Sequence, residues 1–198
     1  MMSAKKIALI VALLIVALPR LCLAERLGFQ IGASSEHIDL EASYESPLND
    51  SYQEMGAGLY YHDDYWITNL NFSLKGEVFT SGLTLGLGLK GFFGEIENRN
   101  KDFDLRAVGF RILGAYDFKE MFYDLPMNAS VSICYAPDPL SFSDTNRYQE
   151  FRLSIFLYIL RNAAIGISYT DFEARFDDPS GEVKESDDAV LVSLRLGF

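Results

Sequence analysis

Residues 190–198 read Val-Leu-Val-Ser-Leu-Arg-Leu-Gly-Phe, and this stretch decides the fold of the chain. Side chains of an extended strand point alternately to opposite faces. One face of this stretch is therefore wholly apolar, with Val190, Val192, Leu194, Leu196 and Phe198. The other face mixes Leu191, Ser193, Arg195 and Gly197. This alternation predicts a β-strand with one apolar face and one partly polar face.

The same stretch resembles the terminal strand of bacterial outer-membrane barrels, whose final phenylalanine is read by the assembly machinery of that membrane. The resemblance implies that Leu194, Leu196 and Phe198 form an assembly signal. It also implies that the barrel-assembly machinery is a partner during insertion.

The first 24 residues have the composition of a secretory signal peptide. Lys5 and Lys6 precede an apolar run over residues 7–18, and Ala24 precedes the expected cleavage site. These 12 apolar residues are too few to cross a membrane as a helix, which takes about 20. A lipid-anchored Cys22 is the weaker alternative, because residues 19–21 lack the small side chains of a lipoprotein signal. We expect residues 1–24 to be removed and residues 25–198 to form the mature domain.

Charge and cysteine content exclude several classes of protein. Loss of Lys5, Lys6 and Arg20 with the leader lowers the formal net charge from −11 to −14. Such an acidic chain repels phosphate backbones, so we expect no nucleic-acid partner. Cys134 is the only cysteine after residue 24, so the mature chain cannot form an internal disulfide. No later apolar run is long enough for a transmembrane helix.

Alternation with a period of two continues through the mature chain. It is clearest over residues 83–90, where every second residue is leucine. Similar stretches predict ten strands, near residues 27–33, 38–44, 55–61, 66–75, 83–90, 107–118, 127–135, 150–157, 163–170 and 190–198. We predict an all-β fold, an antiparallel up-and-down transmembrane β-barrel of ten strands. Eight strands are the fallback if the first hairpin, with its short turn at residues 34–36, folds differently.

The connections between these strands are of two kinds. Residues 94–102, 137–146 and 177–188 are long and polar, whereas residues 160–162 form a tight link. Long and short connections alternate backwards from Phe198, as expected when long loops face the outside and short turns face the periplasm. An even number of strands then places both termini on the periplasmic side.

A period of two does not show which face lies inside, and a soluble periplasmic lipocalin-like barrel would turn its apolar face inward. Three features favour the membrane. The apolar stretches are about ten residues long, enough to cross a bilayer at a tilt. The opposite face is rich in Gly, Ser and Asn, which suits a narrow lumen. Aromatic residues gather at strand ends as an interfacial girdle would: Tyr60, Tyr61, Tyr65, Trp66, Phe92, Phe93, Tyr116, Phe118, Phe122 and Tyr123. We expect the bacterial outer membrane as the location, with its lipids and lipopolysaccharide as partners.

Three segments resemble the YfaZ family of proteobacterial outer-membrane proteins. They are residues 60–65 (Tyr-Tyr-His-Asp-Asp-Tyr), the strand with Gly86, Gly88 and Gly91, and residues 135–142 (Tyr-Ala-Pro-Asp-Pro-Leu-Ser-Phe). The resemblance spans most of the mature chain, and its distinctive motif is the corner at residues 135–141. It implies an exported barrel, and it implies no established reaction or substrate.

Seven charged residues fall on the predicted lumen face: Lys75, Lys90, Arg111, Asp117, Glu150, Arg152 and Arg195. We expect them to pair across the interior, because an unpaired buried charge costs much free energy. Barrels of about eight strands are filled by their own side chains, and open pores need about 16 strands. Ten strands therefore predict a largely filled, polar lumen. In a narrow pore, the excess of Lys and Arg on this face would attract anions.

A lipid-modifying hydrolase or acyltransferase is the alternative function. Both histidines, His37 and His62, fall near the outer rim; serines at residues 34–35 lie near His37, and aspartates at residues 63–64 follow His62. Loop histidines among acidic residues are more often merely solvated, so we expect no enzyme.

No metal or cofactor site is predicted. The acid-rich residues 171–188 lack the ligand spacing of an EF-hand loop, so we expect a solvated outer loop there. From its position in the alternation, we expect Cys134 to be a small side chain that faces the lumen and not a nucleophile. The sequence thus predicts a non-enzymatic outer-membrane protein, either a structural envelope protein or a narrow passive channel.

Overall fold

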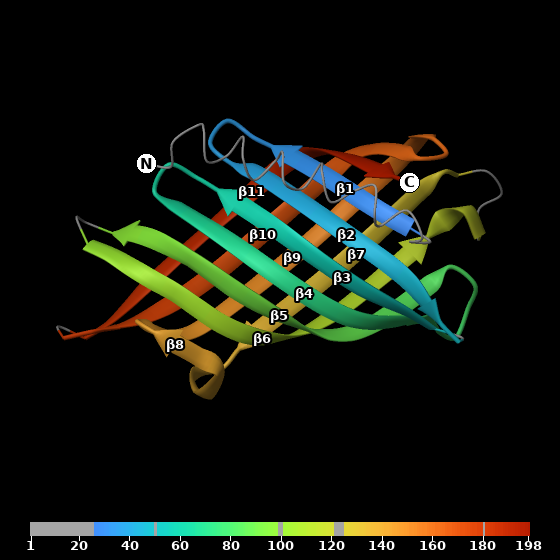
Figure 1. The fold of residues 1–198 in the computed structure, drawn as a ribbon. Helices are drawn as coiled ribbons and strands as arrows, with labels where there is room; N and C mark the ends of the chain where they lie inside the picture. Colours follow the sequence, from blue (N-terminus) through green and yellow to red (C-terminus); the bar gives the residue numbers. More distant parts are fainter. Residues whose placement is uncertain (1–25, 50, 99–100, 121–124, 180) are drawn as a thin grey trace.

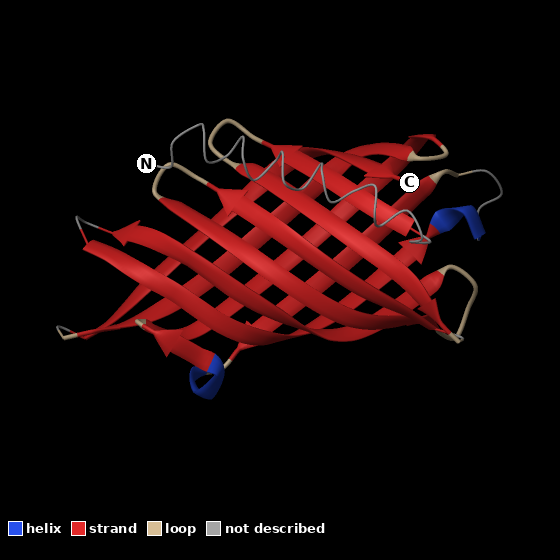
Figure 2. Cartoon of the chain, viewed as in Figure 1, coloured by secondary structure: helices blue, strands red, loops and turns tan. Residues whose placement is uncertain are grey.

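A computed structural model describes residues 26–49, 51–98, 101–120, 125–179 and 181–198, and these form one antiparallel β-barrel (Figures 1 and 2). The predicted signal peptide, residues 1–24, lies outside the described residues. Among the described residues, no helix is long and apolar enough to span a membrane.

Ten strands make up the barrel wall, and β8 is a three-residue segment at its rim. The strands are β1 (Arg26–Ala33), β2 (Ile38–Leu48), β3 (Ser51–Tyr61), β4 (Tyr65–Glu77), β5 (Leu83–Asn98), β6 (Lys101–Asp117), β7 (Met127–Ala136), β8 (Ser141–Ser143), β9 (Thr145–Leu160), β10 (Ala163–Asp178) and β11 (Gly181–Gly197). Two short 3-10 helices are η2 (Phe118–Glu120) and η3 (Asp138–Leu140).

The first and last strands pair with each other and close the barrel. Their register runs from Gly28 opposite Gly197 to Ala33 opposite Val192. Leu27 and Phe198 exchange two backbone hydrogen bonds, of 3.0 and 2.8 Å, at the end of this seam. Every wall strand is therefore hydrogen-bonded to two neighbours. The first hairpin is present, so the prediction of ten strands is confirmed and the eight-stranded fallback is wrong.

Two segments, β7 and the short β8, share the place in the wall between β6 and β9. Residues 110–117 of β6 pair with β7, and residues 105–107 pair with β8. Pro137 has no backbone N–H, so the ladder is interrupted there, and the chain makes the η3 turn before it rejoins the wall (Figure 1). The Tyr-x-Pro-Asp-x-Leu-Ser motif of residues 135–141 is this corner.

Two of the predicted long loops are strand instead. β5 continues to Asn98 and β6 begins at Lys101, while β10 continues to Asp178 and β11 begins at Gly181. The expectation of long outer loops was wrong here because charged residues crowd these stretches, yet Ile96, Phe103 and Phe176 still point inward and are buried. The connection at residues 118–126, on the side of the termini, is longer than the short turn expected there.

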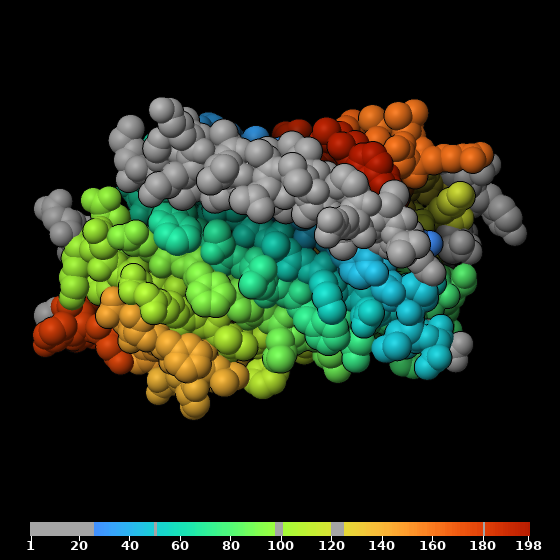
Figure 3. Space-filling model, viewed as in Figure 1, coloured from blue at the N-terminus to red at the C-terminus, as the bar shows by residue number. Residues whose placement is uncertain are grey.

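The apolar face points outward and the polar face inward. Leu87, Ile167 and Val192 are 66%, 59% and 73% exposed, whereas Ser73 and Ser168 are fully buried. Figure 3 shows one face of the outer wall, over β3 to β6. A lipocalin-like soluble barrel has the opposite arrangement, so that alternative is wrong.

The predicted aromatic girdle is only half correct. One member of each neighbouring pair points outward and the other is buried inside: Tyr61 against Tyr60, Trp66 against Tyr65, and Phe93 against Phe92. Adjacent residues of a strand must face opposite sides, so both members of a pair cannot lie in a girdle. Tyr116 and Phe118 pack edge to face near the end of β6, and Phe122 and Tyr123 lie outside the described residues.

Candidate functional site: the barrel lumen

Buried ion pairs fill the middle of the lumen, and we call them the charged layer. At its centre, Lys90 Nζ on β5 lies 2.6 Å from Glu150 Oε1 on β9, and both side chains are buried. Strands β6 and β7 lie between β5 and β9 in the wall. The pair therefore reaches across the lumen rather than along its wall.

A second bridge connects β9 to the far side of the barrel. Arg152 Nη1 lies 3.1 Å from Asp39 Oδ2 and 3.2 Å from Glu41 Oε2, both on β2. Three strands, β10, β11 and β1, separate β9 from β2. In a ten-stranded barrel this is one strand short of directly opposite, so Arg152 spans nearly the full lumen.

The remaining basic side chains of the charged layer are also held in place. Lys75 pairs with Glu45, and its Nζ lies 2.8 Å from Glu54 Oε2. Arg111 donates hydrogen bonds to Glu54 at 2.9 Å, Asn71 at 3.1 Å and Ser132 at 3.1 Å.

Arg195 and Asp117 differ from the other predicted lumen residues. Arg195 donates two hydrogen bonds, of 2.9 and 3.2 Å, to the Gln30 side chain and lies 3.8 Å over the Phe156 ring. Asp117 is at the end of β6, where its carboxylate accepts a 3.0 Å hydrogen bond from the Lys119 backbone. Asp117 thus caps the chain near the η2 turn and lies outside the charged layer.

The expected excess of basic charge inside the barrel is wrong. Lys75, Lys90, Arg111, Arg152 and Arg195 are matched by five interior carboxylates, those of Asp39, Glu41, Glu45, Glu54 and Glu150. The sequence prediction named only Glu150 of these five. The other four lie on β2 and β3, on the strand face opposite to the apolar side chains. The alternation pattern could therefore have identified them as lumen residues. The charged layer is balanced and offers anions no net attraction.

Aromatic side chains fill the outer end of the lumen, and we call them the aromatic plug: Tyr60, Tyr65, Phe92, Phe103, Tyr148, Phe172 and Phe176. The Phe92 and Tyr148 rings are 4.2 Å apart, and the Phe103 and Phe176 rings are 4.9 Å apart. Phe92, Tyr148 and Phe176 are 0%, 1% and 0% exposed. The Tyr148 hydroxyl lies 3.5 Å from Glu150, which joins the plug to the charged layer.

Sequence reasoning missed the plug because it treated the lumen face as polar along its whole length. The signal was present on β5, where the inward positions change from Gly86 and Gly88 to Lys90 and then Phe92. On β10 the inward positions change in the same way, from Ser168 and Thr170 to Phe172. The lumen is therefore polar in its middle and apolar towards its outer end.

His37 lies at the outer edge of the plug, beyond the apolar outer band. His37 Nε2 is 2.7 Å from Asp187 Oδ2, and the Tyr65 hydroxyl donates a 2.5 Å hydrogen bond to the same oxygen. Partial burial raises the pKa of Asp187, but the hydrogen bonds from Tyr65 and His37 outweigh it and hold that pKa below its usual value. The His62 ring lies 4.7 Å from that of His37, tilted by 31°.

The arrangement around His37 does not favour a hydrolase. Ser34 Oγ lies 3.2 Å from His37 Nδ1, but it also accepts hydrogen bonds from the backbone N–H groups of Glu36 and His37, at 3.4 and 3.1 Å. Both lone pairs of this hydroxyl therefore hold the hairpin turn. His62 contacts only Asp64 among the acids that follow it, at 3.7 Å on an exposed turn.

Cys134 is a packing residue of the barrel wall, and its thiol is buried. Cys134 is fully buried, and its Sγ would lie 2.5 Å from a Cβ atom at Gly109, so the thiol fills a space next to a glycine. Within the described part of the chain, no three His, Cys, Asp or Glu side chains are arranged to hold a metal ion.

These features define the class of the protein. A closed barrel with an apolar outer wall leaves no backbone polar group exposed to lipid, and strands that alternate between apolar and inward polar residues are typical of bacterial outer-membrane barrels. The chain is an outer-membrane β-barrel, and the predicted location is confirmed.

No family model and no curated protein matches the chain. Among solved structures, the KdgM porin is 11% identical, with 87% of this chain and 96% of that chain covered and a TM-score of 0.42. The NanC porin is 8% identical, with 87% and 97% covered and a TM-score of 0.41. Neisserial surface protein A is 11% identical, with 87% and 94% covered and a TM-score of 0.39.

Proposed function

We propose that this protein is a non-enzymatic envelope barrel that is closed to solutes. The observation that carries the proposal is the aromatic plug, which fills the outer end of the lumen with buried rings. An ion that crossed it would lose most of its hydration shell and meet mainly aromatic carbon, and that costs several kcal/mol or more. The charged layer below the plug offers polar partners to an ion, so the plug is the barrier.

Planar-bilayer recording on refolded protein tests the proposal directly. We expect no discrete current steps, because the plug excludes water along its length. Liposomes containing the barrel should likewise shrink in an impermeant sugar and fail to re-swell in small solutes. Reproducible steps of one size from the unmodified protein would show a channel and overturn the proposal.

The membrane assignment has its own test, which is independent of conduction. The folded barrel should migrate faster than the boiled one in a detergent gel, and only detergent should extract it from cell envelopes. Recovery in the soluble periplasmic fraction would contradict both the location and the proposed function.

We also propose that the chain is a member of the YfaZ family and that Leu194, Leu196 and Phe198 act as its assembly signal. The outward position of Leu194 and Phe198 on the closing strand, 39% and 71% exposed, supports a recognition role. Replacing Phe198 with Ala should lower the amount assembled in cells while the purified chain still refolds in detergent. An equal loss in both settings would assign Phe198 to folding instead.

A further inference from the structure

Three basic side chains lie side by side on the outer surface of β9, β10 and β11, and we call them the cation row. Arg175 on β10 is the register partner of both Arg147 on β9 and Lys184 on β11. Tyr148 and Phe176, next to them in sequence, are buried inside the barrel, so the row faces outward. Like charges placed directly opposite each other across strands are destabilising.

Carboxylates neutralise only part of the cation row. Glu173 lies 2.9 Å from Arg175 and 2.8 Å from Lys184, and Glu182 lies 3.0 Å from Arg175. Arg147 makes no ion pair within the described part of the chain, and its Nε is buried without a hydrogen-bond partner. Its guanidinium leans over the Tyr135 ring at 6.0 Å. Tyr135 lies on β7 and pairs with Gln149, two residues nearer the membrane than Arg147, so the Arg147 side chain leans away from Arg175 and towards the membrane.

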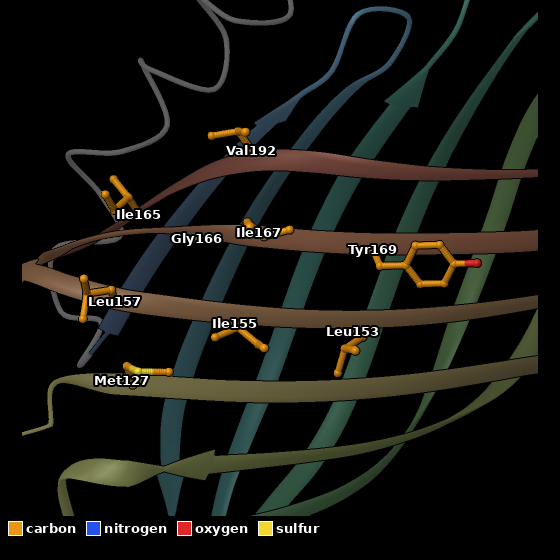
Figure 4. Close-up of a pocket in the computed structure, with 9 residues that line it drawn as sticks. All are labelled: Met127, Leu153, Ile155, Leu157, Ile165, Gly166, Ile167, Tyr169 and Val192. Atoms are coloured by element: carbon orange, nitrogen blue, oxygen red, sulfur yellow. The ribbon is translucent and has the colours of Figure 1, made fainter.

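An apolar groove of about 530 Å³ lies on the same strands, closer to the termini (Figure 4). Its lining includes Leu153, Ile155, Leu157, Ile165, Ile167 and Val192. Tyr169 lies at one end of the groove in Figure 4, and its ring is 6.2 Å from that of Phe151. An aromatic pair thus separates the groove from the charged part of this face, as at a membrane interface.

Between the cation row and the aromatic pair, this face carries hydrogen-bond acceptors. Asp171 and Asp188 are register partners and both point outward, just outside Tyr169 and Val190. Two carboxylates there would repel a phosphate but accept hydrogen bonds from sugar hydroxyls. A bound phosphate would therefore lie at the cation row. An uncharged polar group would fit beside Asp171 and Asp188, on the membrane side of that row.

We propose that this face binds one phosphorylated glycolipid of the outer leaflet, the lipid of lipopolysaccharide. A phosphate lies on Arg147, sugar hydroxyls face Asp171 and Asp188, and one acyl chain occupies the groove. The cation row spans three strands, about 10 Å, which suits a disaccharide with phosphates on both sugars better than a phospholipid with one. Arg147 and Leu153 are six residues apart, about 20 Å along β9, or about 15 Å of height at the usual tilt.

The test measures lipopolysaccharide binding to the refolded barrel in detergent by native mass spectrometry. Arg147→Gln should weaken binding about fivefold to tenfold. Arg106→Gln is the matched control, because Arg106 also faces outward near the rim but on β6, where it pairs with Asp104 at 3.1 Å; this change should leave binding unaltered. Ile155→Trp, which fills the groove, should also weaken binding.

Changing the lipid instead of the protein shows which part of the ligand the face recognises. Lipid with its phosphates removed should lose most of the affinity of the unmodified barrel, and phosphatidylglycerol should compete poorly. Equal binding by the unmodified protein and Arg147→Gln would overturn the proposal. Equal competition by phosphatidylglycerol would show that the face binds any anionic lipid. A lipid-free dimer that Ile155→Trp abolishes would show that the face is an interface between two copies of the chain. Either result would also overturn the proposal.

Discussion

Lys90 and Glu150 show how single charged residues are tolerated inside this barrel. Neither side chain is more than 7% exposed, and each is the main partner of the other. Burial removes both groups from water, and their mutual attraction offsets that cost only while both are present. The pair is therefore a place where one substitution and two substitutions should have different effects.

Replacing Glu150 with Leu alone should lower the free energy of unfolding by about 3–5 kcal/mol, because Lys90 then remains buried without a partner. Adding Lys90→Met should restore most of the loss, since a well-packed apolar pair can replace a buried ion pair. Urea unfolding of the refolded barrel measures both. A double variant as unstable as Glu150→Leu would show that the charged layer matters for more than this pairing.

Asp187 predicts a specific pH dependence at the outer rim. Its pKa is lowered in the folded state, so its ionised form adds stability above the pKa of the unfolded chain. That contribution is lost as the pH falls through the folded value. The stability difference between the unmodified protein and Asp187→Asn should shrink as the pH falls below about 4. Urea unfolding between pH 7 and pH 3 measures the difference, and a difference that does not change with pH would contradict the prediction.

At the scale of strands, β4 and β5 approach unusually closely at Gly88 and at Gly94. A Cβ atom at Gly88 would lie 2.2 Å from the Phe72 backbone oxygen, whereas one at Gly91 would meet nothing closer than 3.6 Å. Both glycines are on β5, three residues apart. They form a matched pair for testing whether this approach requires glycine.

We expect Gly88→Ala to cost about 1–3 kcal/mol of stability, because the backbone of β4 must shift to make room for the methyl group. Gly91→Ala should change stability by a few tenths of a kcal/mol at most, since only ordinary contacts surround it. Urea midpoints of the two variants provide the comparison. Equal midpoints would mean that the two strands separate there at little cost.

The same scale shows what could be read from the sequence. Alternation predicted every wall strand and the closing seam at Phe198, because the face to which a strand side chain points depends only on local backbone geometry. It failed at residues 94–102, where inward Ile96 and Phe103 keep the period but outward carboxylates hide it. The alternation also did not predict which residues contact each other across the barrel. His37 and Asp187, for example, are 150 residues apart. Their contact depends on the tilt and stagger of the strands, which a period of two does not determine.

At the scale of the whole molecule, the lumen has two layers of different chemistry, stacked along the barrel. The charged layer is polar and balanced, so it offers partners to water or to an ion that reaches it. The aromatic plug is apolar and packed from several strands, so water gains nothing by entering. Removing rings should therefore have a larger effect on permeability than removing charges.

Phe92→Ala combined with Tyr148→Ala should turn the barrel into a narrow channel with small, discrete current steps. The two rings are in contact at the centre of the plug, and their loss opens a wet path to the charged layer. Phe93→Ala is the control, because Phe93 is adjacent to Phe92 but faces lipid. A double variant that folds and stays silent would show that the charged layer seals the barrel by itself.

The long strands on one side of the barrel also affect how the cell surface presents this protein. β10 and β11 contain 16 and 17 residues, or about 40 Å of height at a 45° tilt, against an apolar band of about 25 Å. Proteases cut preferentially at exposed loop tips, yet Arg175 and Lys184 lie in hydrogen-bonded strands. Much of the chain that projects beyond the membrane is therefore hydrogen-bonded strand. A protease at the cell surface finds few flexible segments there to cut.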